Sequence, residues 1–204
     1  MIGAGLIGIT GGIGAGKSVV SRILRLQGYE VYDCDLEAKR LMDGSEEVRR
    51  ALAGRWGEDI YREGRLDRPR VAEIVFGDAG EKRWLDTLVH GLVRDHLKGW
   101  MAERDVAGKR LFVESAILYG SGLAEMCSEV WLVTAPLELR LRRVEERSGL
   151  SPDKALARIN AQMPELRLMT EAGIPVREIV NDGNHSLLDA LNIEEEDKSI
   201  IKKS

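Results

Sequence analysis

The sequence predicts an α/β protein in which a parallel five-stranded sheet is flanked by helices. Short apolar segments alternate with amphipathic segments along most of the chain, which is typical of parallel strands joined by helical crossovers. A glycine-rich motif of the phosphate-binding type follows the first apolar segment. The length of 204 residues suits one compact domain, or one core with a small additional lobe.

Five apolar segments are predicted as the strands of this sheet. The first, Leu6–Thr10, is short, apolar and followed by glycines, which favours a buried strand. The last is followed by the run Asn181-Asp182-Gly183-Asn184, which is typical of a turn. The other strands are expected over residues 29–32, 110–114, 130–134 and 178–180.

The segments between these strands are predicted as helices. Residues 18–27 carry apolar side chains at helical spacing, and Gly28 stands where a glycine commonly ends a helix. Ser151 and Pro152 predict a helix start, because serine is a good N-cap and proline is tolerated in the first turn. The helices are expected over residues 18–27, 36–53, 68–76, 82–104, 138–147 and 152–162.

Composition excludes several classes of protein. No apolar run approaches the ~20 residues that cross a bilayer, and no signal peptide is evident, so a protein without a membrane span is expected. Two cysteines, Cys34 and Cys127, cannot form a disulfide framework, which favours the cytoplasm. The net charge of −4 argues against nucleic-acid binding but is compatible with local phosphate binding.

The strongest motif is Gly11-Gly12-Ile13-Gly14-Ala15-Gly16-Lys17-Ser18, which matches G-x-x-x-x-G-K-[ST] between a predicted strand and a predicted helix. Its glycines let successive backbone N–H groups point into one concavity, and the helix N-terminus adds partial positive charge. Lys17 can reach the β- and γ-phosphates of ATP, and the Ser18 hydroxyl can ligate Mg²⁺. We therefore expect an ATP-binding P-loop and the P-loop nucleoside triphosphate hydrolase fold.

Two carboxylates follow the second predicted strand, in Asp33-Cys34-Asp35. They stand at the carboxyl end of a strand, which is where α/β sheets bind ligands. One of them could accept the proton of an acceptor hydroxyl, or an aspartate could cap the next helix. Spacing alone favours neither interpretation. Cys34 is interpreted as a small buried side chain and not as a nucleophile.

Several stretches together resemble the dephospho-CoA kinase family. The run G-I-T-G-G-I-G-A-G-K-S, followed by Gly28 and the D-x-D of Asp33 and Asp35, is similar to the N-terminal signature of that family. Further similar stretches are Gly64-Arg65-Leu66-Asp67-Arg68, Leu88-Val89-His90, Arg143 with Arg147, Ala161-Gln162-Met163 and Asn181-Asp182-Gly183. The similarity extends over about residues 6–185.

The resemblance implies a reaction, an organisation and partners. The reaction is transfer of the ATP γ-phosphoryl group to the ribose 3′-hydroxyl of dephospho-CoA, with Mg²⁺ as cofactor. The implied organisation is one kinase domain over 1–192, with a helical substrate-binding lobe over about 60–105 and a lid over about 138–165. Residues 193–204 are expected to be a charged tail. A cytoplasmic monomer or small homo-oligomer is expected, with no nucleic-acid or membrane partner.

The resemblance also suggests roles for individual residues. Asp35 matches the position of the base toward the 3′-hydroxyl, and Asp33 is its neighbour near the metal or the substrate. Arg143 and Arg147 match the arginine pair of the lid, and arginine suits this role because its planar, permanently charged fork binds phosphate. Arg140, where the family usually has glutamine, is interpreted as part of a solvated helix face.

Three further positions keep two interpretations each. Glu114 ends a predicted strand, where it could orient Mg²⁺ through water or simply face solvent. His90 could contact the phosphates of the acceptor or serve in packing. Arg68 could bind a phosphate of CoA or simply precede Pro69 at a helix start.

Other positions depart from the family pattern. The family's P-L-L-f-E segment is Ala116-Ile117-Leu118-Tyr119-Gly120 here, and Gly91 replaces a proline after His90. A P-loop kinase for another small alcohol, such as a nucleoside, a nucleotide or a sugar acid, is therefore the nearest alternative. A GTPase-like switch would need an N-K-x-D guanine motif, and the sequence contains none.

Overall fold

The computed structural model describes residues 5–104 and 110–191, so the charged tail predicted over 193–204 lies outside the described residues. Two compact units are formed, one by residues 5–32 with 110–191, and the other by Asp33–Arg104. We call them the sheet unit and the helical unit. The helical unit begins at Asp33, earlier than the lobe expected over about 60–105.

The sheet has five strands in the order β2-β5-β1-β6-β7, which confirms the predicted architecture. β1 pairs in parallel with β5 and β6, and β6 pairs in parallel with β7. Every residue of the central strand β1 is buried, as expected for a strand covered on both faces. The strands are β1 (Leu6–Thr10), β2 (Glu30–Asp33), β5 (Leu111–Glu114), β6 (Glu129–Thr134) and β7 (Val176–Val180).

Aromatic and branched side chains fill the core of the sheet unit. The ring of Phe112 meets Tyr29 edge-on at a centroid distance of 5.5 Å and Trp131 at 5.2 Å. Such edge-to-face pairs contribute beyond their buried area, by about 0.5–1.5 kcal/mol each. Ile9 and Leu24 are fully buried in the same cluster, so β1 and the following helix are packed into the core.

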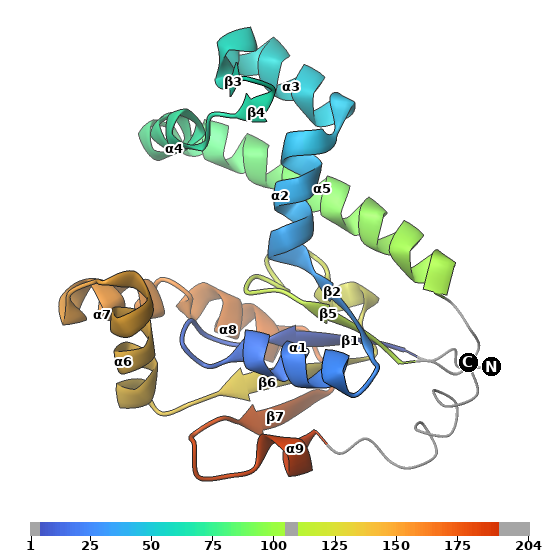
Figure 1. Cartoon of the computed structure of the whole chain (residues 1–204), viewed down its shortest axis with the longest axis vertical. Helices are drawn as coiled ribbons and strands as arrows, with labels where there is room; N and C mark the ends of the chain where they lie inside the picture. The colour runs from blue at the N-terminus through green and yellow to red at the C-terminus, as the bar shows by residue number, and fades with distance from the viewer. Residues whose placement is uncertain (1–4, 105–109, 192–204) are drawn as a thin grey trace. The chain divides into compact units, whose positions relative to one another are not determined.

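Helices surround the sheet, and α6 and α7 lie at the end where β6 and β7 finish (Figure 1). The predicted helix over 152–162 ends at Asn160, and a separate helix, α8, begins at Met163 with Pro164 in its first turn. This second helix was not predicted. The helices of the sheet unit are α1 (Lys17–Leu26), α6 (Leu137–Ser148), α7 (Pro152–Asn160), α8 (Met163–Glu171) and α9 (Leu187–Ala190), with a 3₁₀ turn over Ala124–Met126.

The helical unit corrects one prediction about the helix boundaries. The single helix expected over 36–53 is two helices, because Ser45 adopts an extended backbone conformation and its hydroxyl accepts a hydrogen bond from the Val48 amide at 3.4 Å. A serine with this geometry ends one helix and caps the next. The helices are α2 (Cys34–Gly44), α3 (Glu46–Trp56), α4 (Arg68–Gly77) and α5 (Ala79–Arg104), with a 3₁₀ turn over Glu58–Ile60.

A short hairpin, β3 (Tyr61–Arg62) with β4 (Arg65–Leu66), completes the helical unit and was not predicted. Its turn places Glu63 and Gly64 at positive φ. The unit has its own core, which contains Val48, Leu52, Ile60, Tyr61, Leu66 and Val71. No helix among the described residues is long and apolar enough to cross a membrane.

Both cysteines are buried, which agrees with the interpretation of Cys34 as a buried packing side chain. Burial raises the pKa of the Cys127 thiol to about 12, so very little thiolate forms near neutral pH. We expect Ellman's reagent at pH 8 to label neither thiol of the native protein rapidly and to label both in denaturant. Fast labelling of the native protein would contradict this burial.

Candidate active site

The P-loop connects the end of β1 at Thr10 to the start of α1 at Lys17, in the structural context that the motif requires. Three glycines adopt positive φ in it, Gly11 at 150°, Gly14 at 79° and Gly16 at 102°. A Cβ atom on Gly14 would lie 2.7 Å from the carbonyl oxygen of Arg140. Glycine is therefore required there by both backbone conformation and space.

Side chains from outside the loop hold its carbonyl oxygens. Arg143 Nη1 donates to the carbonyls of Gly14 at 3.1 Å, Ala15 at 3.4 Å and Asn181 at 3.3 Å. Asn181, directly after β7, is buried and its Nδ2 donates to the Ala15 carbonyl at 2.8 Å. These bonds engage the carbonyls of Gly14 and Ala15 from outside the loop, which leaves its N–H groups as the candidates to bind an anion.

Lys17 is the first residue of α1, and its Nζ donates to the carbonyl of Gly11 at 2.8 Å. The Ala15 amide donates to the Gly12 carbonyl at 3.0 Å, which closes a turn inside the loop. The first turn of α1 contains no acidic residue, so its partial positive charge is not offset by its own side chains. The arrangement is suited to the phosphates of a nucleotide.

Arg140 was predicted to lie on a solvated helix face, and this prediction is wrong. Its Nε donates to the carbonyl of Ile13 at 3.0 Å, and the side chain is half-buried. Burial lowers the pKa of the Arg140 guanidinium from its ordinary value, but an arginine remains charged near neutral pH. The residue therefore adds positive charge directly at the P-loop.

Arg147 lies in the last turn of α6 and is exposed, whereas Arg143, one turn earlier, is directed to the P-loop carbonyls. The two arginines thus differ in what they contact. Arg143 fixes the loop that would hold phosphate, and Arg147 presents its charge to solvent.

Two oxygen-bearing side chains lie at the carboxyl edge of the sheet. Glu114 is the last residue of β5 and is paired in register with Ile9 of the neighbouring β1. Ser18, the second residue of α1, is exposed. Hydroxyl and carboxylate oxygens are the donors that Mg²⁺ prefers, so both residues fit a magnesium site chemically.

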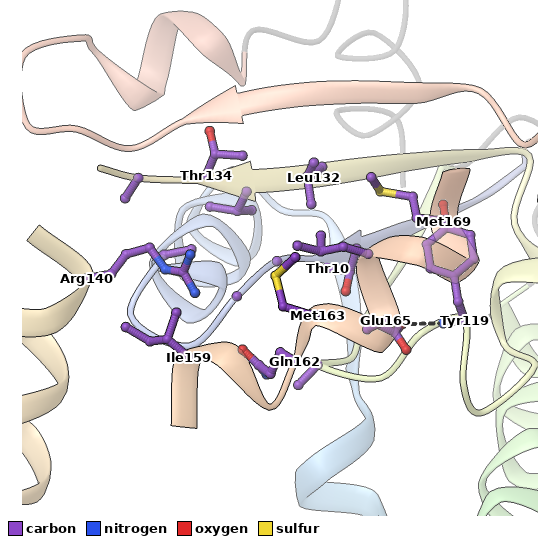
Figure 2. A pocket seen from close by; sticks show the side chains of 17 residues that line it. Thr10, Tyr119, Leu132, Thr134, Arg140, Ile159, Gln162, Met163, Glu165 and Met169 are labelled. Carbon is purple, nitrogen blue, oxygen red and sulfur yellow. Dashed lines mark hydrogen bonds between the residues drawn. The ribbon is translucent and has the colours of Figure 1, made fainter. Parts of the chain in front are cut away.

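A cavity of about 250 Å³ opens beside the P-loop, with Arg140 reaching in from α6, and Gln162, Met163 and Glu165 from the α7–α8 region (Figure 2). Most of its lining is apolar. Glu165 accepts hydrogen bonds from the Tyr119 amide at 2.6 Å and the Gly120 amide at 3.0 Å. This carboxylate therefore ties α8 to the loop after β5.

The aspartates of the D-x-D motif have different surroundings. Asp33 is the N-cap of α2, and its Oδ1 accepts a hydrogen bond from the Leu36 amide at 3.0 Å. Asp35 is in the first turn of the same helix and is exposed. The capping interpretation therefore holds for Asp33, and the Asp35 carboxylate is accessible to a ligand.

Arg68 and His90 also belong to the helical unit. Arg68 Nη2 donates to Asp43 Oδ2 at 2.9 Å, so part of its guanidinium is already paired. His90 is half-buried in α5, and burial lowers the pKa of its imidazole. A neutral imidazole can still donate a hydrogen bond to a phosphate.

Comparison with known proteins decides the family. A sequence model of the dephospho-CoA kinase family matches residues 5–185. The chain belongs to the dephospho-CoA kinase family. Dephospho-CoA kinases of Porphyromonas gingivalis and Bacteroides fragilis are 41% and 34% identical to it, over 79% and 89% of this chain and 79% and 87% of theirs.

Solved structures agree with the fold of a dephospho-CoA kinase. The crystal structure of TT1252 from Thermus thermophilus has 35% identity and a TM-score of 0.75, covering 98% of both chains. Dephospho-CoA kinase from Campylobacter jejuni has a TM-score of 0.64 over 97% of this chain and 96% of that one, at 24% identity. The second similarity supports the fold alone.

The sequence of this dephospho-CoA kinase family member predicts the P-loop but indicates no role for three residues. Two of them bond to the P-loop and the third bonds to the loop after β5. Gln162 and Asn181 stand in stretches that resemble the family, yet nothing in their spacing shows that they bond to P-loop backbone atoms. Glu165 carries no motif at all. Such contacts join segments far apart in the chain, so only the fold reveals them.

Proposed function

We propose that the protein transfers the γ-phosphoryl group of ATP to the ribose 3′-hydroxyl of dephospho-CoA, giving coenzyme A and ADP. The observation that carries this proposal is a P-loop whose carbonyls are fixed by Lys17, Arg140, Arg143 and Asn181, in a chain that belongs to the dephospho-CoA kinase family. Phosphoryl transfer depends mainly on positioning and electrostatic stabilisation, which such a loop supplies.

The phosphate side of the reaction is assigned to the sheet unit. The phosphates are assigned to the loop amides of residues 11–18 other than those of Ile13 and Ala15, which donate to acceptors within the protein. Lys17 is proposed to neutralise charge on the β- and γ-phosphates. Arg147 is proposed to contact the transferring group because it is exposed, while Arg143 acts from behind the loop. Mg²⁺ is proposed as the cofactor, held by Ser18 and, through water, by Glu114; it would neutralise charge on the transferring phosphoryl group.

The acceptor side is assigned to the helical unit. Asp35 is proposed as the base that accepts the proton of the 3′-hydroxyl, since it is exposed while Asp33 caps α2. Arg68 and His90 are proposed to bind the acceptor. Asp33 is proposed to lie near the metal or the substrate. We propose that the enzyme acts in the cytoplasm as a monomer or small homo-oligomer, with residues 138–165 as its lid.

An acceptor panel tests the assignment. The purified protein is incubated with ATP and Mg²⁺ and with dephospho-CoA, a nucleoside, a nucleotide or a sugar acid, and ADP release is measured. We expect release with dephospho-CoA at a rate well above that with any other acceptor. If dephospho-CoA gave no ADP while another alcohol did, the substrate assignment would be wrong although the P-loop kinase chemistry would stand.

Replacement of Arg143 by methionine tests whether its hydrogen bonds to the P-loop carbonyls support nucleotide binding. The substitution removes donors to three carbonyls, and hydrogen bonds to charged groups contribute about 1.5–3 kcal/mol. We expect ATP affinity, measured by calorimetry, to fall about tenfold or more. Arg142, exposed on the same helix, provides the matched control in Arg142→Met. Equal affinities of the two variants would contradict the role of Arg143.

A further inference from the structure

One residue of the P-loop, Ile13, has both of its backbone polar groups held by side chains. Arg140 Nε, from α6, donates to its carbonyl at 3.0 Å. Its amide donates to Gln162 Oε1 at 2.5 Å, across 149 residues of sequence. Both side chains come from the segment between β6 and β7, so this one segment holds the Ile13 peptide groups from two sides.

The contact of Gln162 differs in kind from the others at the loop. Lys17, Arg140, Arg143 and Asn181 all donate to carbonyl oxygens, whereas Gln162 accepts from an N–H group. A neutral carboxamide oxygen can hold an amide without placing a negative charge beside the phosphates. Glutamate would accept equally well but would repel a nucleotide, so the residue type suits the position.

The position of Gln162 is itself fixed by the fold. It stands between the end of α7 at Asn160 and the start of α8 at Met163, with Pro164 next in the chain. Ile159, at the end of α7, is buried, and Glu165 bonds two backbone amides of the loop after β5. The carboxamide therefore projects from an anchored junction that we call the α7–α8 junction.

We propose that Gln162 is a positioning residue for phosphoryl transfer. It fixes the first turn of the P-loop by accepting a hydrogen bond from the Ile13 amide, while Arg140 donates to the Ile13 carbonyl. The proposal rests on the proposed function and adds to it a link between the α7–α8 junction and the phosphate cradle. Through this link, the placement of the junction sets the placement of residues 12–14.

Loss of the Gln162 contact is expected to affect the rate of phosphoryl transfer more than the affinity for the nucleotide. The second half of the loop is held by Arg143 and Asn181, which do not depend on Gln162. The phosphates nearest the N-terminus of α1 thus keep their ligands when Gln162 is replaced. Displacement of the first turn by a fraction of an ångström lowers the transfer rate, because a misplacement of about 1 Å can cost on the order of 10²-fold.

Amide exchange tests the contact without any acceptor. In the nucleotide-free protein, the Ile13 amide proton is expected to exchange at least about tenfold faster in Gln162→Met than in the wild type, because methionine offers no comparable acceptor. Gln162→Glu keeps an oxygen at the same length and is expected to keep the protection. Unchanged exchange in Gln162→Met would overturn the proposed contact.

Kinetics test the positioning role. We expect Gln162→Met to lower kcat for dephospho-CoA about tenfold to a hundredfold while ADP affinity by calorimetry changes less than about threefold. Arg167→Met puts the same side chain at an exposed site on α8, outside the proposed lid, and is expected to leave both values unchanged. A kcat within twofold of the wild type, or equal losses in kcat, ADP affinity and thermal stability, would overturn the role.

Failure of the two proposals is distinguishable. A wild-type enzyme that phosphorylates dephospho-CoA, combined with an unaffected Gln162→Met variant, overturns only the role of Gln162. A wild-type enzyme that is inactive with dephospho-CoA overturns the proposed function. In that case the exchange measurement still decides whether Gln162 holds the loop.

Discussion

Replacing Lys17 by alanine is expected to abolish measurable turnover, with a loss of kcat of at least about 10²–10³-fold. Lys17 is the first residue of α1, and its ammonium already lies 2.8 Å from the Gly11 carbonyl at the start of the loop. The charge therefore lies at the loop that is proposed to bind the phosphates. Its removal would leave the charge that develops in the proposed transition state without the lysine cation of the loop.

The Lys17→Ala experiment needs a readout of folding and a matched lysine. Circular dichroism and thermal unfolding are expected to remain close to the wild type, since Lys17 is not part of the core. Lys98, exposed on α5 and paired with Asp95 at 2.9 Å, gives the control Lys98→Ala with unchanged turnover. Turnover by Lys17→Ala at more than a tenth of the wild-type rate would show that other groups position the phosphates.

Replacing Asp35 by asparagine is expected to lower kcat by about 10²–10⁴-fold, the usual contribution of a general base. The substitution keeps the size of the side chain but removes the carboxylate that is proposed to accept the proton of the 3′-hydroxyl. Asp35 is exposed in the first turn of α2, so little packing is lost and stability should change little. ADP release under saturating ATP and dephospho-CoA measures the effect.

Two neighbours on the same helix make the Asp35 result specific. Glu37→Gln removes a negative charge from the first turn of α2, at a residue paired with Arg40, and is expected to keep near wild-type activity. Asp33→Asn keeps a good N-cap residue, so the helix should stay stable while only the charge of Asp33 is lost. Near wild-type kcat in Asp35→Asn would assign the base to another group.

The sheet was predictable because its signals are local. A central parallel strand such as β1 is a short, mostly apolar run, and the P-loop glycines adopt backbone conformations that few other residues accept. The break between α2 and α3 at Ser45 was not predicted, because the residues on both sides have helical spacing and the N-cap serine lies between them. The hairpin β3–β4 was missed because two-residue strands leave almost no periodic pattern.

The candidate site was predictable only where one segment supplies the chemistry. The P-loop lies within eight consecutive residues, so its motif is complete in the sequence. The contacts of Arg140 in α6 and of Gln162 at the α7–α8 junction reach that loop across 127 and 149 positions. A charged helix face such as that of Arg140 is usually solvated, and only the packing of α6 against the loop distinguishes this arginine from its neighbours.

The strand order has a consequence for how the protein is made. β1, near the start of the chain, is the middle strand of the sheet, and Leu6 pairs with Leu111 while Thr10 pairs with Leu132. A ribosome must therefore translate the whole helical unit, and then β5 and β6, before this strand has a partner on both sides. The helical unit draws on one continuous stretch and has its own core, so it is expected to fold first on the emerging chain, with nucleotide binding acquired last.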